Sequence, residues 1–385
     1  MKPLMLRRRS LLATVVVSAL TVPATVALSQ ELRARARDAY ARAVELETQG
    51  NDAGALSLLW EAAGLAPHDA DVQNRLGEAL ERTGALEAAV EAYRLAVFER
   101  PAFRKASNNL ILALVKAGKG SEAVDRARAL VSAAPDDPDP HFTLGLAQSE
   151  QDVAEAIKSF RRVLELAPRH TLARYNLALV LRRADRLPEA LVELERALAI
   201  EPRPEVHYTR GVIYWHQGDL EGAASELRAA VAAEPGYTDA HYTLGAVLKA
   251  NRDWAGAAAS LRRAIALRPD LSAAHYLLGQ VLQVHGDESD ARTHLEEAER
   301  LRQRAHLEEE ARVWTVVGTQ EMETGELAGA VDHFRRATTV FEAYAPAHYQ
   351  MGLALRRLGQ HEASRAAFAR ARTLNPSLIP PPDTP

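Results

Sequence analysis

The chain has 385 residues, of which 47% are hydrophobic and only 5% aromatic, and it contains no cysteine. The lack of cysteine excludes disulfides, thiolate catalysis and cysteine-ligated metal sites. The 47 Lys and Arg residues against 51 Asp and Glu residues give a net charge of −4, which argues against nucleic-acid binding, because that needs a basic face.

Residues 1–29 predict a targeting segment outside the fold, a signal peptide. Three arginines at positions 7 to 9 precede an uncharged stretch. Ala27-Leu28-Ser29 then offers the small residues that a signal peptidase reads, which predicts cleavage before Gln30. The arginines also resemble a twin-arginine signal, with ordinary Sec export as the alternative route. The stretch is close to the lower length limit of a membrane span, so an uncleaved anchor stays open as well. We therefore expect an exported protein, periplasmic or secreted, with anchoring at the bacterial inner membrane as the alternative.

Beyond the leader, a proline returns every 33 or 34 residues, at Pro67, Pro101, Pro135, Pro168, Pro202, Pro235 and Pro269, and again at Pro376. A fixed period of this length predicts stacked repeats. Within each period apolar residues recur three and four apart, which indicates helices. A glycine such as Gly218 splits the unit into two helices, and the proline ends the second one.

Small residues mark where the two helices of a unit meet. A glycine lies in the first helix of most units, as at Gly77, Gly145, Gly211, Gly245, Gly279, Gly318 and Gly352. The second helix carries an alanine and then a large residue, for example Tyr93, Phe160, Phe334 or Phe368. We expect the large side chain to fill the space that the glycine leaves.

The period is interrupted once, between Gly279 and Gly318, which are 39 residues apart. The charged run there, Glu299 to Arg312, lacks the terminal proline. We expect eight repeats over residues 30–302, an extended helix or charged helical spacer over 303–310, and two repeats over 311–376. Residues 377–385 contain three successive prolines and predict a disordered proline-rich tail.

The pattern of glycine, alanine, Phe or Leu, alanine and proline at this spacing resembles the tetratricopeptide repeat (TPR) family. Ten copies begin near Ala36, Ala70, Arg104, Pro138, Thr171, Pro204, Thr238, Ser272, Ala311 and Ala345. The resemblance implies an all-α fold, an α-solenoid of about ten helix-turn-helix repeats that forms a right-handed superhelix. The family's early tryptophan is kept only at Trp314.

The fifth position of six copies is aromatic, at Phe142, Tyr175, Tyr208, Tyr242, Tyr276 and Tyr349. In the TPR family this position lines the concave surface, together with the residues four and seven further on. The resemblance therefore implies a partner-binding groove that also contains Arg182, Trp215, Lys249, Gln280 and Arg356. Aromatic anchors beside polar or cationic groups suit a bound peptide. The alternative is that these rings pack along the neighbouring helix.

Histidines are the other candidate for chemistry, because His141, His207, His241, His275 and His348 recur at one repeat position. Side chains one repeat apart lie along a ridge and do not converge, so we interpret them as structural. Phosphate-cradling loops, His-Glu-x-x-His and nucleophile elbows are missing from the sequence.

We predict a non-enzymatic scaffold that uses no cofactor and no metal. Its expected partner is a protein or peptide, with no nucleic acid and no small-molecule substrate, and it would meet a membrane only through an uncleaved leader. The alternatives are an inner-membrane-anchored adaptor in cell-envelope assembly and, less favoured, an enzyme or a carbohydrate-binding protein.

Overall fold

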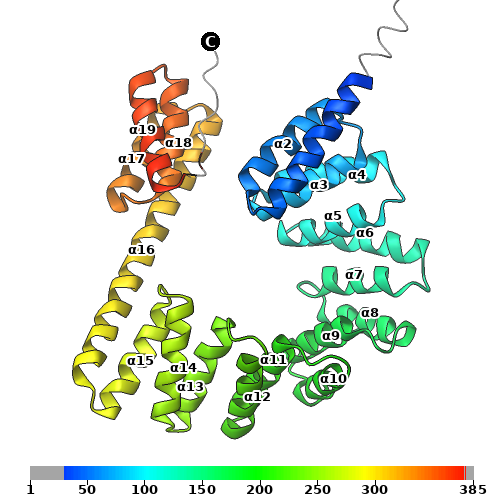
Figure 1. Cartoon of the computed structure of the whole chain (residues 1–385). Coiled ribbons are helices and arrows are strands. Elements are labelled where there is room, and N and C mark those ends of the chain that lie inside the picture. The colour runs from blue at the N-terminus through cyan, green and yellow to red at the C-terminus, as the bar shows by residue number, and fades with distance from the viewer. Residues whose placement is uncertain (1–29, 377, 379–385) are drawn as a thin grey trace, which may run out of the picture. The chain divides into compact units, whose positions relative to one another are not determined.

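The computed structural model describes residues 30–376 and residue 378 (Figure 1). Helices joined by short turns make up this part of the chain, and it contains no β-strand. The predicted all-α repeat fold is therefore confirmed. The predicted leader over 1–29 and the predicted tail over 377–385, except residue 378, lie outside the described residues.

The chain falls into two compact units, one ending at Glu201 and one starting at Pro202. In the first unit, consecutive helix pairs are residues 30–48 with α2 (Asp52–Leu65), α3 (Ala70–Arg82) with α4 (Leu86–Glu99), α5 (Arg104–Lys116) with α6 (Gly120–Ala133), α7 (Pro138–Gln148) with α8 (Val153–Leu166), and α9 (Thr171–Arg183) with α10 (Leu187–Ile200).

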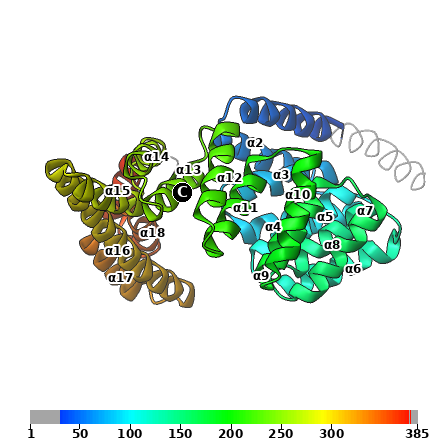
Figure 2. The same cartoon turned by 90° about the horizontal axis from the view of Figure 1, so that it is seen from below.

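The second unit continues the same pattern until its middle. Its helices are α11 (Pro204–His216), α12 (Leu220–Ala233), α13 (Thr238–Ala250), α14 (Trp254–Leu267), α15 (Ser272–His285), α16 (Glu288–Thr324), α17 (Leu327–Val340), α18 (Ala345–Arg357) and α19 (His361–Leu374). Within each unit, every helix packs on the helices that precede and follow it in the sequence (Figure 2).

Local chemistry defines the turn inside each repeat. Gly218 has a φ of 82°, a left-handed conformation that ends α11 without a steric penalty. The Asp219 carboxylate then accepts a hydrogen bond from the backbone N–H of Gly222 at 2.9 Å and caps α12. These two residues reverse the chain, so the two helices of a repeat lie antiparallel.

The predicted pairing of small and large residues is confirmed. A Cβ atom added at Gly245 would lie 2.6 Å from Cγ of Leu261, and one at Gly318 would lie 2.7 Å from Cε1 of Phe334. Both large side chains are fully buried. The close approach of the two helices in each repeat therefore depends on a missing side chain.

Four of the five recurring histidines connect their first helix to the turn before it, whereas His207 contacts Glu226 in the second helix of its own repeat. The Nε2 atoms of His141, His241 and His275 lie 2.8, 3.2 and 3.1 Å from the carbonyl oxygens of the prolines six residues earlier. Gln73 and Arg174 donate to the same kind of proline carbonyl at the same repeat position. These side chains satisfy a backbone acceptor that the helix end leaves open, so their role is structural.

One element departs from the repeat. α16 is a continuous helix of 37 residues that passes through 303–310 without a break. Its first half packs on α15 as a second helix, and its second half packs on α17 and α18 as a first helix (Figure 1). Residues 302–310, between the two halves, are all exposed.

Candidate partner-binding surface

The first helices α11, α13 and α15 of the second unit form one continuous face, because α13 contacts both α11 and α15. We call this surface the first-helix face. Tyr208 and Trp215 come from α11, Tyr242 and Lys249 from α13, and Tyr276 and Gln280 from α15. These six sequence-predicted residues therefore lie on three neighbouring helices.

The aromatic residues of this face also pack between repeats. The ring of Tyr208 lies 5.1 Å from the ring of Tyr237, which immediately precedes the next first helix. In the first unit, Phe142 makes the same contact with His170 at 5.0 Å. Tyr208, Trp215 and Tyr242 are half-buried against the core. Their rings are thus partly structural and partly open.

Tyr276 differs from the other aromatic residues of the series, since 51% of its surface is exposed. Tyr237, which packs on Tyr208, immediately precedes the next repeat. For Tyr276 the residue in this position is Glu310, which lies in the exposed middle of α16. No following repeat therefore covers the Tyr276 ring.

The polar residues of the predicted groove fall into two groups. Lys249 Nζ donates to Oε1 of Gln280, a contact that joins two consecutive repeats. Arg356 contacts a ring of its own repeat, since its guanidinium lies 6.0 Å from the Phe368 ring, and Tyr349 lies 5.5 Å from the same ring.

Tyr175 and Arg182 belong to α9 of the first unit. The Tyr175 side chain is half-buried and that of Arg182 is exposed.

An ionic ladder in the first unit was not predicted from the sequence. Glu78 Oε1 accepts from Asn74 Nδ2 at 3.0 Å and lies 2.7 Å from Lys105 Nζ. Asn109 Nδ2 donates to Asn74 Oδ1 at 3.1 Å. Burial by itself would raise the pKa of Glu78, but Lys105, Asn74 and Arg75 outweigh it and hold the pKa below its ordinary value. The sequence signal that could have revealed this ladder is an acidic residue in one first helix, Glu78, and a lysine in the next first helix, Lys105.

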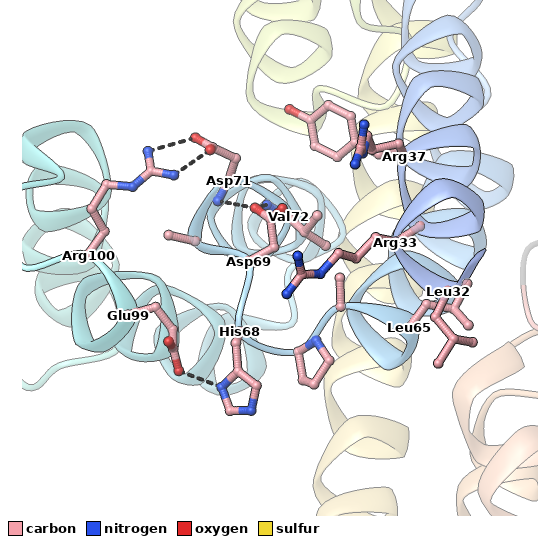
Figure 3. Close-up of a pocket in the computed structure, with 15 residues that line it drawn as sticks. Leu32, Arg33, Arg37, Leu65, His68, Asp69, Asp71, Val72, Glu99 and Arg100 are labelled. Atoms are coloured by element: carbon pink, nitrogen blue, oxygen red, sulfur yellow. Dashed lines mark hydrogen bonds and ion pairs between the residues drawn. The ribbon is translucent and has the colours of Figure 1, made fainter. Parts of the chain in front are cut away.

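A pocket of about 830 Å³ lies in the first unit, between the helix over 30–48 and the start of α3 (Figure 3). Its carboxylates are engaged. Asp71 pairs with Arg100, Glu99 lies 2.8 Å from His68, and Asp69 accepts from the first N–H groups of α3. Each of these three acids therefore has a partner, and the pocket contains no sequence-predicted site residue.

Residues 30–376 offer neither a cluster of metal ligands nor a membrane-spanning helix. Clusters of three or more His, Cys, Asp or Glu side chains that would suit a metal ion are not found there. In the same range, every helix is too short or too polar to cross a bilayer.

Comparison with known proteins places these repeats in a family. Two family models, both described as tetratricopeptide repeat, match the chain, one over residues 147–213 and the other over 24–104, 193–238, 242–306 and 318–379. No curated protein matches the sequence.

Solved structures resemble the fold at low sequence identity. A tetratricopeptide repeat protein from Parabacteroides merdae ATCC 43184 is 17% identical, with a TM-score of 0.51, over 64% of this chain and 99% of that one. MamA from Desulfovibrio magneticus RS-1 is 23% identical, with a TM-score of 0.39, over 43% and 95% of the two chains. YrrB, described as a TPR protein with an unusual peptide-binding site, is 19% identical, with a TM-score of 0.41, over 46% and 91%.

The family models together match well over half of the residues, and the described helices repeat with the same period. The chain belongs to the tetratricopeptide repeat family.

Proposed function

We propose that this protein is a non-enzymatic scaffold or adaptor that binds an extended protein segment on the first-helix face of its second unit. The observation that carries the proposal is the placement of Trp215, Tyr242 and Lys249 on adjacent first helices. Solenoids present long surfaces of this kind to partners. The fold alone does not give a function, so the proposal rests on these side chains.

The surface is suited to binding because its groups are held in place before a partner arrives. Trp215 and Tyr242 pack against the core on one side, so ordering them on binding costs little side-chain entropy. Lys249 is oriented by Gln280 and retains further donor capacity for carbonyl or carboxylate groups of a partner. A segment with an apolar side chain next to an acidic one fits this arrangement.

A role without catalysis agrees with how the ionisable residues are used. Four of the five recurring histidines bond to backbone carbonyls, His207 contacts the Glu226 carboxylate, and the pocket carboxylates are paired. We further propose export, from the arginine-rich leader and the Ala27-Leu28-Ser29 site. A leader that stays uncleaved would make the protein an inner-membrane adaptor for cell-envelope assembly.

Peptides selected from a displayed random library on the purified protein provide a defined probe. Trp215→Ala and Lys249→Ala should each weaken their binding, the tryptophan by about thirtyfold, since an aromatic hot spot contributes about 2 kcal/mol. The matched controls are Trp60→Ala, at a 53% exposed tryptophan on α2, and Lys158→Ala, on the second helix α8. Thermal melts of all four variants show whether each remains folded.

Unchanged affinity in folded Trp215→Ala and Lys249→Ala variants would remove the first-helix face as the working surface. Turnover of a substrate by the purified protein would contradict the scaffold role itself.

A further inference from the structure

The repeat stack is interrupted between copies eight and nine, and both broken ends expose apolar side chains. At the third position of a first helix, Ala240, Ala274 and Ala347 are fully buried under the preceding repeat. Val313 holds this position in copy nine and is 49% exposed, and Val316 beside it is 46% exposed. The face of copy nine that a preceding repeat would cover is therefore exposed to solvent.

The face of copy eight that a following repeat would cover is exposed as well. Tyr276 is 51% exposed. It lines a pocket of about 430 Å³ between α15 and α16, together with Leu295 and Ala298. In copies six and seven, the following first helix occupies the corresponding place.

These two faces cannot meet within one chain while α16 is continuous. The first half of α16 contributes to one face and the second half forms the other. A straight helix of 37 residues spans about 55 Å, and its two halves cannot stack on each other. Glycine and proline do not occur between Glu288 and Val317, and Arg302–Glu299 and Arg312–Glu309 ion pairs support the helix.

We propose that a second copy of this chain fills the gap. Two α16 helices pair antiparallel about a twofold axis near His306, so that residues 311–324 of each chain stack on copy eight of the other. This arrangement continues the interface between consecutive repeats, in which a second helix lies antiparallel to the next first helix. Such an exchange of an identical element is a common route to dimers, because no new interface has to be created.

The charges on the two faces support a second copy as the occupant. The antiparallel pairing places Arg292 opposite Gln320 and close to Glu323, and Arg302 opposite Glu310. Arg292, Glu310 and Glu323 make no ion pair in the part of the chain that the structure describes. Arg292 stands where copies six and seven have the buried Ala224 and Ala258, so copy eight carries a charge at a position that is apolar in those two copies, and the second chain would bring Glu323 close to it.

Light scattering coupled to size exclusion, on the full chain at micromolar concentration, measures the oligomeric state. We expect a dimer. Val313→Glu combined with Val316→Glu should raise the dimer dissociation constant by about a hundredfold or more, because charges enter an apolar junction. Val192→Glu, at a 44% exposed valine on α10, is the matched control and should leave the dimer intact.

Crosslinking distinguishes the exchanged dimer from the other arrangements. Lys249 and Gln280 touch across the junction of copies seven and eight, and their equivalents across the gap are Gln283 and Thr319. The chain has no cysteine of its own, so Gln283→Cys combined with Thr319→Cys gives a clean pair for a short bismaleimide. Lys249→Cys with Gln280→Cys is the positive control and should crosslink within one chain.

We expect the Gln283/Thr319 pair to crosslink between chains, including between differently tagged copies that were mixed. A monomer at all concentrations would overturn the proposal. So would crosslinking within one chain, since α16 would then have to bend back on itself. A dimer that survives the Val313 and Val316 substitutions in a variant with unchanged helix content would place the interface elsewhere and would equally overturn it.

Discussion

At the level of single residues, a missing side chain sets how closely the two helices of a repeat approach. A Cβ atom at Gly245 would meet both the Leu261 side chain and the carbonyl oxygen of Ala257 in the facing helix. A backbone atom cannot move aside as a flexible side chain can, so the space at this glycine is rigid. The recurring glycines in the sequence therefore mark where the two helices of a repeat come into close contact.

Gly245→Val should therefore lower the free energy of unfolding by about 1–3 kcal/mol through overpacking. Its Cβ would lie 2.6 Å from Cγ of Leu261. Gly64→Val is the matched control, because a Cβ at this helical glycine meets nothing within 4 Å. Denaturant unfolding compares the two variants. Equal stability of Gly245→Val and the wild type would mean that the helices of this repeat do not meet as described.

A second residue-scale feature is a pair of histidines. His275 and His294 approach to 3.0 Å between their Nδ1 atoms, and Nε2 of His275 donates to the carbonyl of Pro269. Burial, followed by the neighbouring His275 and then Arg262, holds the pKa of His294 below its ordinary value, against the smaller opposite effects of Asp290 and Glu297. Folding therefore favours the neutral form of His294.

Because the pKa of His294 is lower in the folded state, the unfolded chain takes up this proton first as the pH falls. The contribution to stability is present above the unfolded pKa and is lost below it. The melting temperature of the wild type should decrease as the pH is lowered from about 7.5 to 5.5. The melting temperature of His294→Gln should decrease less over the same range. The exposed His361→Gln serves as control. An identical pH dependence of wild type and His294→Gln would exclude the pair as its cause.

At the scale of elements, the missing proline after copy eight explains α16. Elsewhere a proline ends the second helix, because it lacks a backbone N–H and disfavours helix in the residue before it. Here the chain continues through arginine, glutamate, alanine and leucine, which are all good helix formers. Of the two sequence-based expectations, an extended helix or a helical spacer, the structure has one unbroken helix.

A helix without tertiary contacts opens more readily than a packed one. In the Val313→Glu/Val316→Glu variant, trypsin should therefore cut first between Arg300 and Arg312, where residues 302–310 are exposed. Mass spectrometry of the earliest fragments locates the cut. A first cut inside copies four to seven would show that the middle of α16 is protected by contacts other than the proposed junction.

At the scale of the whole molecule, the chain divides into two compact units at Glu201 and Pro202. The proline period passes through this point unchanged, so the sequence offers no sign of the division. The connection between α10 and α11 is one of the shortest of its kind, covering only residues 201–203. Which repeats form a compact unit is therefore a property of the folded chain.

The cellular location of the protein also concerns the whole molecule. The leader prediction is that the mature chain begins at Gln30, from the arginines at positions 7 to 9 and the Ala27-Leu28-Ser29 site. N-terminal sequencing of the protein isolated from the cell envelope measures this. An intact Met1 in the membrane fraction would instead make the segment an anchor, and a soluble intact chain would contradict both forms of export.

The sequence by itself determined the helices, their pairing and the repeat family, because the signals for these are local. Helix starts at Ala70 and Thr238 coincide with the predicted copy starts, and the glycines and large residues meet as expected. Each of these features depends on residues within one repeat, so periodicity and spacing were sufficient to find them.

The tertiary structure decided which predicted site residues remain open. Tyr208, Tyr242 and Tyr276 occupy the same repeat position, yet the first two are half-buried and the third is exposed. The difference comes from the following repeat, which covers the first two rings and is held away from the third by α16. The ionic ladder of Glu78 and Lys105 was hidden for a related reason, since its members come from different repeats. Burial depends on what packs against a side chain, and that neighbour lies a full repeat away in the sequence.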